Sequence, residues 1–97
     1  MKIENLTSAK GNNIANQFKI AAKNKTYFQS YNSVVASIDK TTGKVELYQD
    51  WDYSKTTSKY LYRFLAEYGH KELNNKKAVE AAIKQGKVAY SEKSPSI

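Results

Sequence analysis

Basic side chains spaced for one face of a helix are the first residues of this sequence that could do chemistry. Lys55, Lys59 and Arg63 recur every four residues, which places them in one basic ridge along a helix, with Tyr62 beside it. Amines and guanidinium groups bind phosphate oxygens, and a tyrosine ring stacks on bases. The ridge therefore fits a nucleic-acid surface, although solubility alone also places lysines on an outer helix face.

Two further lysines belong to a second helical segment. Lys76 and Lys77 stand in its first turn, where their amines are available to phosphates. A helix, a turn at Gly69 and a second helix faintly resemble a DNA-binding helix-turn-helix. However, the connection from Gly69 to Asn74 is longer than the usual roughly three or four residues, and the second helix is rich in alanine. Packing is the commoner reason for two helices joined by a loop.

The residues that could support catalysis lack the partners that a reaction needs. His70 is the only histidine, and no serine stands in a nucleophile elbow. The chain has no cysteine, which excludes a thiolate nucleophile, a thiolate metal site and a disulfide. Asp50 and Asp52 lack the further oxygens and the glycine of a calcium loop, so we expect them to cap a helix start and to balance nearby lysines. We therefore predict no enzyme activity, no cofactor and no metal site.

Length and charge limit both the architecture and the partner. The 97 residues suit a single domain, and 16 Lys and Arg against nine Asp and Glu give a formal charge of +7. Residues 1–38 and 55–97 are basic, whereas residues 39–54 are net acidic. A basic surface favours polyanionic partners. No apolar run approaches the roughly 20 residues of a membrane span, and residues 1–5 are not those of a signal peptide, so we expect a cytoplasmic protein with no membrane partner.

Alternating and β-branched stretches predict the strands. A short strand at residues 2–3 would precede a loop at residues 4–13. The longer strands are expected at residues 14–22, 26–31, 34–38, 44–49 and 87–91. In the first of these, the even-numbered apolar residues from Ile14 to Ala22 would share one face, with Gln17 and Lys19 turned away from it.

A hairpin is predicted in the middle of the chain. The turn at residues 39–44 opens with Asp and closes on Gly before Lys, which suits a type I turn whose last residue takes positive φ. It would join two antiparallel strands. In the second strand Val45 and Leu47 would face inward, and Glu46 and Tyr48 would face outward.

The period of the pattern changes to that of helices after the hairpin. Ser54 or Thr56 caps the first helix, and Gly69 ends it as a positive-φ cap. A shorter helix begins near residues 74–75 and stops at Gly86. The apolar face of the first helix consists of Tyr60, Leu61, Phe64, Leu65 and Tyr68.

The order of these elements predicts an α+β fold. We expect an antiparallel sheet of four to five strands with two C-terminal helices packed on one face. Residues 1–97 would form one domain. Its expected parts are an N-terminal segment and loop (1–13), a β-meander (14–49), a helix pair (54–86), a last strand (87–91) and a tail (92–97).

Two stretches of the chain form a recognisable pattern. Residues 30–36 read SY-x-S-x-VA, and residues 53–59, which open the first helix, read YS-x-TT-x-K. Together with residues 11–18, they resemble a group of small proteins from bacteriophages and mobile elements. The resemblance covers about residues 11–65. It implies a phage or plasmid accessory protein that works in a bacterial cytoplasm, and it brings no assigned activity and no catalytic residues.

Two kinds of function fit these observations. The first is a non-enzymatic phage or mobile-element accessory protein that binds nucleic acid, DNA in preference to RNA, through a basic and aromatic surface. The second is an anti-CRISPR-like inhibitor that binds a host defence protein; at +7 it is not a DNA mimic. An exposed strand edge at residues 14–22 and eight tyrosines also allow a homodimer.

Overall fold

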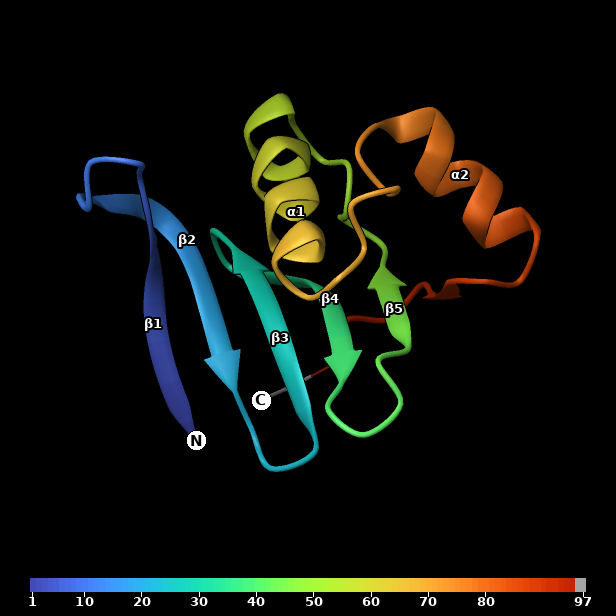
Figure 1. The fold of residues 1–97 in the computed structure, drawn as a ribbon, viewed down its shortest axis with the longest axis horizontal. Coiled ribbons are helices and arrows are strands. Elements are labelled where there is room, and N and C mark those ends of the chain that lie inside the picture. Colours follow the sequence, from blue (N-terminus) through green and yellow to red (C-terminus); the bar gives the residue numbers. More distant parts are fainter. Residues whose placement is uncertain (96–97) are drawn as a thin grey trace.

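A mostly antiparallel sheet of six strands forms the frame of the protein (Figure 1). The computed structural model describes residues 1–95. The strands are β1 (Lys2–Thr7), β2 (Asn13–Ala21), β3 (Lys25–Ser30), β4 (Ser33–Asp39), β5 (Val45–Tyr48) and β6 (Ala89–Ser91). The first five strands form an antiparallel meander, and β6 runs parallel to β5. The predicted α+β class is confirmed, with six strands in place of four to five.

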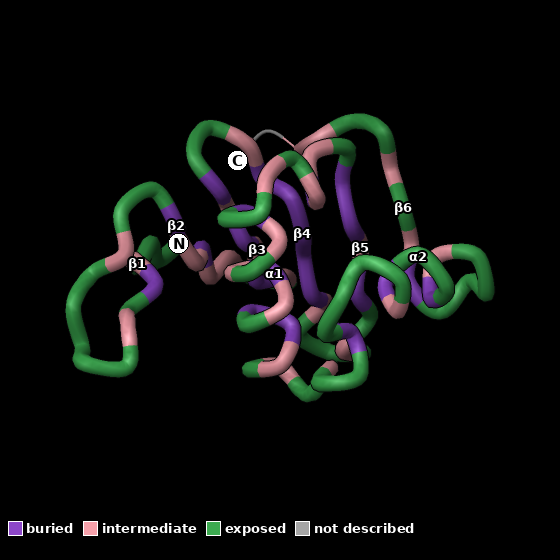
Figure 2. Tube along the Cα trace, turned by 90° about the horizontal axis from the view of Figure 1, so that it is seen from above, coloured by how far each residue is buried: buried purple, intermediate pink, exposed green. Residues whose placement is uncertain are grey.

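Both helices lie in the connection between β5 and β6. In Figure 1, α1 (Lys55–Glu67) crosses in front of the centre of the sheet, and α2 (Lys76–Lys84) lies beyond β5. Seen from above in Figure 2, the two helices are on the same side of β3, β4 and β5. A crossover of this kind is needed because two parallel neighbours cannot be joined by a tight hairpin. The arrangement agrees with the predicted helix pair on one face.

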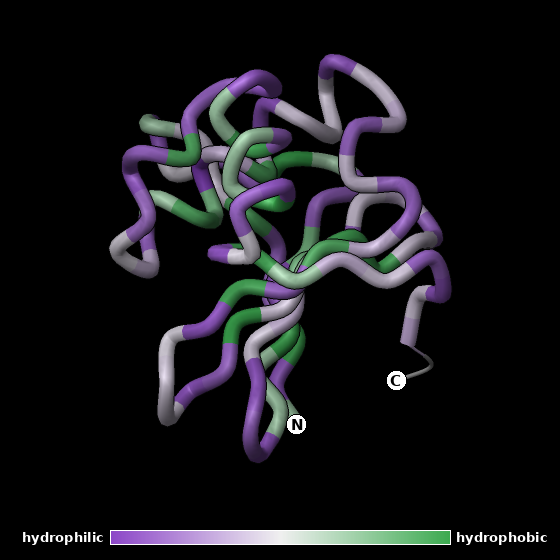
Figure 3. Tube along the Cα trace, turned by 90° about the vertical axis from the view of Figure 1, so that its right-hand side faces the viewer, coloured by the Kyte–Doolittle hydropathy of each residue, from purple (hydrophilic) through white to green (hydrophobic). Residues whose placement is uncertain are grey.

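Apolar side chains fill the space between α1 and the sheet. On α1, Leu61, Phe64 and Leu65 are buried, as their helical spacing predicts. They form one cluster with Phe28 of β3 and Leu47 of β5. Figure 3 shows hydrophobic segments gathered where the sheet meets the helices and hydrophilic segments at the hairpin tips. This packing holds α1 against the sheet and turns the opposite face of the helix to solvent.

The first strand is longer than its sequence indicates. The predicted strand at residues 2–3 extends through Thr7, so the expected loop at residues 4–13 is wrong for residues 4–7. Glu4 pairs with Lys19 and Asn5 pairs with Phe18 across the β1–β2 ladder. The sequence of this strand shows no alternation of apolar and polar residues, because most side chains of an edge strand can be exposed and polar. The exposed edge therefore belongs to β1, and not to residues 14–22 as predicted.

The two faces of β2 are the reverse of those predicted. Lys19 pairs with Phe28, whose ring stacks on Phe64 of α1 at a centroid distance of 5.5 Å. Lys19 and Gln17 therefore lie on the side that carries α1, and Gln17 is completely buried. Ile20 is buried as well, on the other side. The predicted single apolar face is also interrupted: Asn16 has a φ of +65°, and Ile14, unlike Ile20, packs against the core cluster that contains Phe28 and Phe64. Both faces of this strand are partly covered, so polarity does not identify the inner one.

The turn between β4 and β5 has the predicted form. Gly43 has a φ of +75°, and its N–H donates to the carbonyl of Asp39 at 2.8 Å. The backbone N–H groups of Thr42 and Thr41 donate to the Asp39 carboxylate and lower its pKa. This turn fixes the register of the hairpin.

One residue of β5 departs from the predicted pattern. Val45 and Leu47 are buried as expected, but Tyr48 is also buried, with 4% of its surface exposed. The Tyr48 hydroxyl donates to Glu46 at 2.9 Å and lies 2.9 Å from the hydroxyl of Ser37. Burial raises the pKa of Tyr48 to about 12.

The chain after α2 returns to the sheet as its sixth strand. The last strand, Ala89–Ser91, is shorter than the predicted 87–91. Beyond it, the Ser94 hydroxyl donates to the carbonyl of Val34 in β4 at 2.9 Å. The predicted tail at residues 92–97 is therefore attached to β4 within its described part, and residues 96–97 lie outside the described residues. Neither α1 nor α2, the helices of the described part, is long and apolar enough to cross a membrane.

Tyr48 is expected to make the free energy of unfolding fall at alkaline pH, and Tyr48→Phe should remove this part of the pH dependence. Its native pKa of about 12 exceeds the value of about 10 in an unfolded chain, so the unfolded state loses this proton first. The contribution of Tyr48 is thus complete below about pH 10 and is lost as the pH rises through about 12. Urea unfolding of both proteins across this range measures the difference.

A second, pH-independent effect accompanies the Tyr48→Phe change. Near neutral pH the variant should be less stable by about 1 kcal/mol, because one buried and one partly buried hydrogen bond are removed. Equal slopes of unfolding free energy against pH in the two proteins would contradict the assignment.

Candidate nucleic-acid interface

A cluster of hydroxyl groups fixes the start of α1. Ser54 is the N-cap, because its hydroxyl accepts from the N–H of Thr57 at 3.1 Å. The Thr57 hydroxyl is buried and lies 2.8 Å from that of Ser30 in β3. Of the two predicted caps, Ser54 is thus the right one, and Thr56 is not. The bonds tie the first turn of α1, which carries Lys55, to the sheet.

The two aspartates before α1 do not cap it as predicted. Asp52 instead forms an ion pair with Lys76, the first residue of α2, at a distance of 3.2 Å. The hydrogen bond to Asp52 raises the pKa of Lys76. Asp50 accepts from the hydroxyl of Ser33 at 3.2 Å. Ser54 occupies the N-cap position. The Asp52 carboxylate therefore bonds to α2, and the Asp50 carboxylate bonds to β4.

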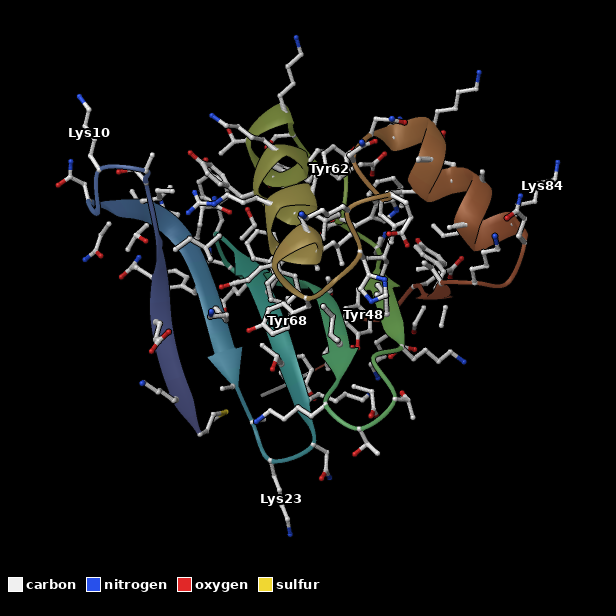
Figure 4. The ribbon with its side chains drawn as sticks, viewed as in Figure 1. Lys10, Lys23, Tyr48, Tyr62, Tyr68 and Lys84 are labelled. Carbon is white, nitrogen blue, oxygen red and sulfur yellow. The ribbon has the colours of Figure 1, made fainter. Side chains whose placement is uncertain are left out.

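Four of the six predicted site residues line one surface hollow, which we call the cationic hollow. Its volume is about 540 Å³, and it lies between the first half of α1 and the start of α2. It is lined by Lys55, Lys59, Tyr62, Lys76, Asp52, Ser54 and Ser58. Figure 4 shows Tyr62 on the side of α1 that faces α2. Burial raises the pKa of Tyr62 above its ordinary value.

Arg63 lies apart from the cationic hollow. Its guanidinium donates to the carbonyl of Thr7 in β1, and it lines a different hollow of about 410 Å³ between β1 and α1. Successive i, i+4 positions rotate around a helix, so a ridge of three residues drifts from one side to the next. Tyr60 connects the two sides: the amine of Lys59 lies 5.2 Å from its ring centre and the guanidinium of Arg63 lies 6.0 Å away.

Lys77 also stays outside the cationic hollow. It is exposed in the first turn of α2, next to Lys76. Asn75 caps this helix by accepting from the N–H of Ala78 at 2.8 Å, which confirms the predicted start at residues 74–75. The predicted pair is thus divided, with one lysine inside the cationic hollow and one beside it.

Three residues that line the cationic hollow are not among the predicted site residues: Asp52, Ser54 and Ser58. The sequence predicts helix-capping roles for Asp52 and Ser54, and it assigns no role to Ser58. Ser58 stands three residues after Lys55 and four before Tyr62, and that spacing places it on the same helix face. Asp52 has no such signal, because its partner Lys76 is distant in sequence.

His70 has a structural environment. Its Nε2 lies 3.0 Å from the carbonyl of Gly43, and its Nδ1 lies 3.7 Å from Glu72. It therefore links the end of α1 to the β4–β5 turn. Within residues 1–95 no group of three or more histidine, aspartate and glutamate side chains is arranged to hold a metal ion.

One comparison with known proteins produced a match. A family model described as a family of unknown function (DUF8033) matches residues 1–81. No curated protein and no solved structure matches the chain. The matched segment runs from β1 into α2, so it contains all six predicted site residues.

Proposed function

We propose that this chain, which belongs to a family of unknown function (DUF8033), is a non-enzymatic accessory protein that binds nucleic acid through the cationic hollow. The gathering of three lysines and Tyr62 in one hollow carries the proposal. Amines bind phosphates and an adjacent ring can stack on a base or sugar. From the resemblance of residues 11–65 to phage and mobile-element proteins we infer a role in a bacterial host cell, and we propose DNA as the preferred ligand.

The balance of charge in the cationic hollow supports the same proposal. Lys76 is paired with Asp52. Among the described residues, neither Lys55 nor Lys59 lies within ion-pair distance of a carboxylate. Two exposed positive charges are therefore left for an anionic ligand. They stand near the N-terminus of α1, where a cation is unfavourable, so helix stability does not explain them.

Reversing both charges, in Lys55→Glu/Lys59→Glu, is expected to weaken nucleic-acid binding. At low salt the affinity should fall roughly tenfold or more, and the slope of log affinity against log salt should shrink by about 2, one for each phosphate that a lysine no longer neutralises. Fluorescence anisotropy of a labelled DNA oligonucleotide, titrated at several NaCl concentrations, measures both quantities.

Lys10→Glu/Lys23→Glu is the matched control for this experiment. It makes the same change in net charge, and Figure 4 shows both lysines at hairpin tips away from the helices. The control should keep most of the affinity. An equal loss in both variants would mean that total charge, rather than the cationic hollow, drives binding. A wild-type protein that binds no DNA or RNA but co-purifies with a host protein after nuclease treatment would favour a protein-binding inhibitor instead.

A further inference from the structure

A second hollow adjoins the cationic hollow. It has a volume of about 540 Å³ and lies between the β3–β4 turn and the loop that leads into α1. Tyr31 and Tyr53 line it from these two segments, so we call it the tyrosine hollow. Ser54 lines both hollows, which makes them neighbours on one surface. A volume of this size is within the range of pockets that hold small ligands.

The two tyrosine rings are unusually exposed. Tyr53 has 75% of its surface exposed and Tyr31 has 44%. Among the described residues, Tyr90 is the one other exposed tyrosine. Two of the three exposed tyrosines therefore line the same hollow. Exposed aromatic rings around a hollow are typical of binding sites, because a flat ligand can cover them. The tyrosine hollow therefore offers stacking surfaces.

Tyr31 adopts a backbone conformation that does not favour its side chain. It has a φ of +56° in a two-residue turn between the paired residues Ser30 and Ser33. Turns of this kind take glycine or asparagine at positive φ, and other residues cost about 1 kcal/mol or more there. Glycine would thus suit the fold better at this position. The chain has tyrosine here despite that cost, and Tyr31 lines the tyrosine hollow. A role of its side chain in binding would explain the choice.

The polar groups of the tyrosine hollow indicate what kind of ring it takes. Asp50 lines the hollow, and one of its oxygens accepts from Ser33. A carboxylate repels phosphate but accepts readily from the amino group of a base such as cytosine. The amines that suit phosphates are in the adjoining cationic hollow, where Lys55 lies next in sequence to Ser54. The two hollows thus separate base chemistry from phosphate chemistry.

We propose that the tyrosine hollow takes an unstacked base of a single-stranded nucleic acid, while the phosphates on its flank lie on the lysines of the cationic hollow. This inference rests on the proposed function and specifies its ligand. Bases in a duplex are stacked and paired, so they do not reach such a hollow. The protein should therefore bind a single strand more tightly than a duplex of the same sequence.

Tyr31→Gly separates this role from the stability of the fold. Glycine relieves the positive φ, so the melting temperature should hold or rise. Affinity for a labelled single-stranded DNA should nevertheless fall about 5- to 150-fold, which is the range that removing one stacked base implies. Binding to the duplex should not change. Tyr53→Ala should give the same selective loss.

Tyr90→Ala is the matched control, because Tyr90 has the same 44% exposure as Tyr31 but lies in β6, away from the tyrosine hollow. If Tyr31→Gly disturbs the turn, Tyr31→Asn tolerates positive φ and replaces it.

The outcomes distinguish the inference from the function on which it rests. Wild-type affinity for the single strand in Tyr31→Gly and Tyr53→Ala, together with the expected loss of affinity in Lys55→Glu/Lys59→Glu, would overturn the base site and leave the proposed function standing. An equal loss in Tyr90→Ala would also overturn it. A wild-type protein that binds neither single strand nor duplex would overturn both.

Discussion

Phe64→Ala is expected to lower the free energy of unfolding by about 3–5 kcal/mol. The Phe64 ring is buried, stacks on Phe28 of β3 at a centroid distance of 5.5 Å and lies tilted against the ring of Tyr68 at 5.1 Å. Truncation removes apolar burial, two aromatic contacts and the packing that joins α1 to the sheet. A small domain has about 5–15 kcal/mol in total, so much of its stability would disappear. Urea unfolding followed by Trp51 fluorescence measures the change.

The truncation Tyr53→Ala is the control for Phe64→Ala. It also removes an aromatic ring, but one that is mostly exposed, so the change should stay within about 0.5 kcal/mol. A loss below about 1 kcal/mol in Phe64→Ala would contradict the prediction. It would mean that contacts other than the Phe28 stack hold α1 in place. The hollows on the outer side of α1 would then not depend on this core.

Gln17→Met is expected to raise the free energy of unfolding by about 1–3 kcal/mol. Gln17 is fully buried under α1, and among the described residues neither its Nε2 nor its Oε1 has a hydrogen-bond partner. A buried polar group without a partner costs about that much, because it gives up its bonds to water. Methionine is unbranched and of similar length, so it can fill the same space with apolar atoms.

Gln29→Met provides the comparison for Gln17→Met. On the neighbouring strand, the Gln29 amide donates to the carbonyl of Tyr31 at 2.8 Å. The same substitution there should lower stability by about 0.5–1.5 kcal/mol, because it removes a bond that is made. A fall in Gln17→Met as well would contradict the prediction, because it would show that the Gln17 amide is satisfied in solution.

The helices and the meander could be predicted because each has a local signal. The spacing of Leu61, Phe64 and Leu65 defines one helix face, and Gly69, with its φ of +92°, marks where α1 ends. The β4–β5 turn is likewise encoded by Asp39 and Gly43. Each of these features depends on residues that are close in sequence, so they are visible without a structure.

The features that the sequence could not reveal depend on contacts between distant segments. β1 is a strand because β2 pairs with it, and its own side chains are mostly polar. The basic ridge divides because Arg63 reaches Thr7, which is 56 positions away, whereas Lys55 and Lys59 face the start of α2. The tyrosine hollow brings together Tyr31 and Tyr53, which are 22 positions apart in the chain. Local spacing identified the basic residues but not their grouping.

The parallel pairing of β6 with β5 has a consequence for how the chain assembles. During synthesis on a ribosome, β1 to β5 emerge first, and adjacent antiparallel strands can pair as soon as each is complete. β6 emerges only after α1 and α2, and it reaches β5 across a long loop whose closure costs entropy. Until then the outer edge of β5 has unpaired N–H and C=O groups. Docking of α1 and α2 lowers the entropic cost of this loop closure, because it brings the chain back to the edge of β5 with which β6 pairs.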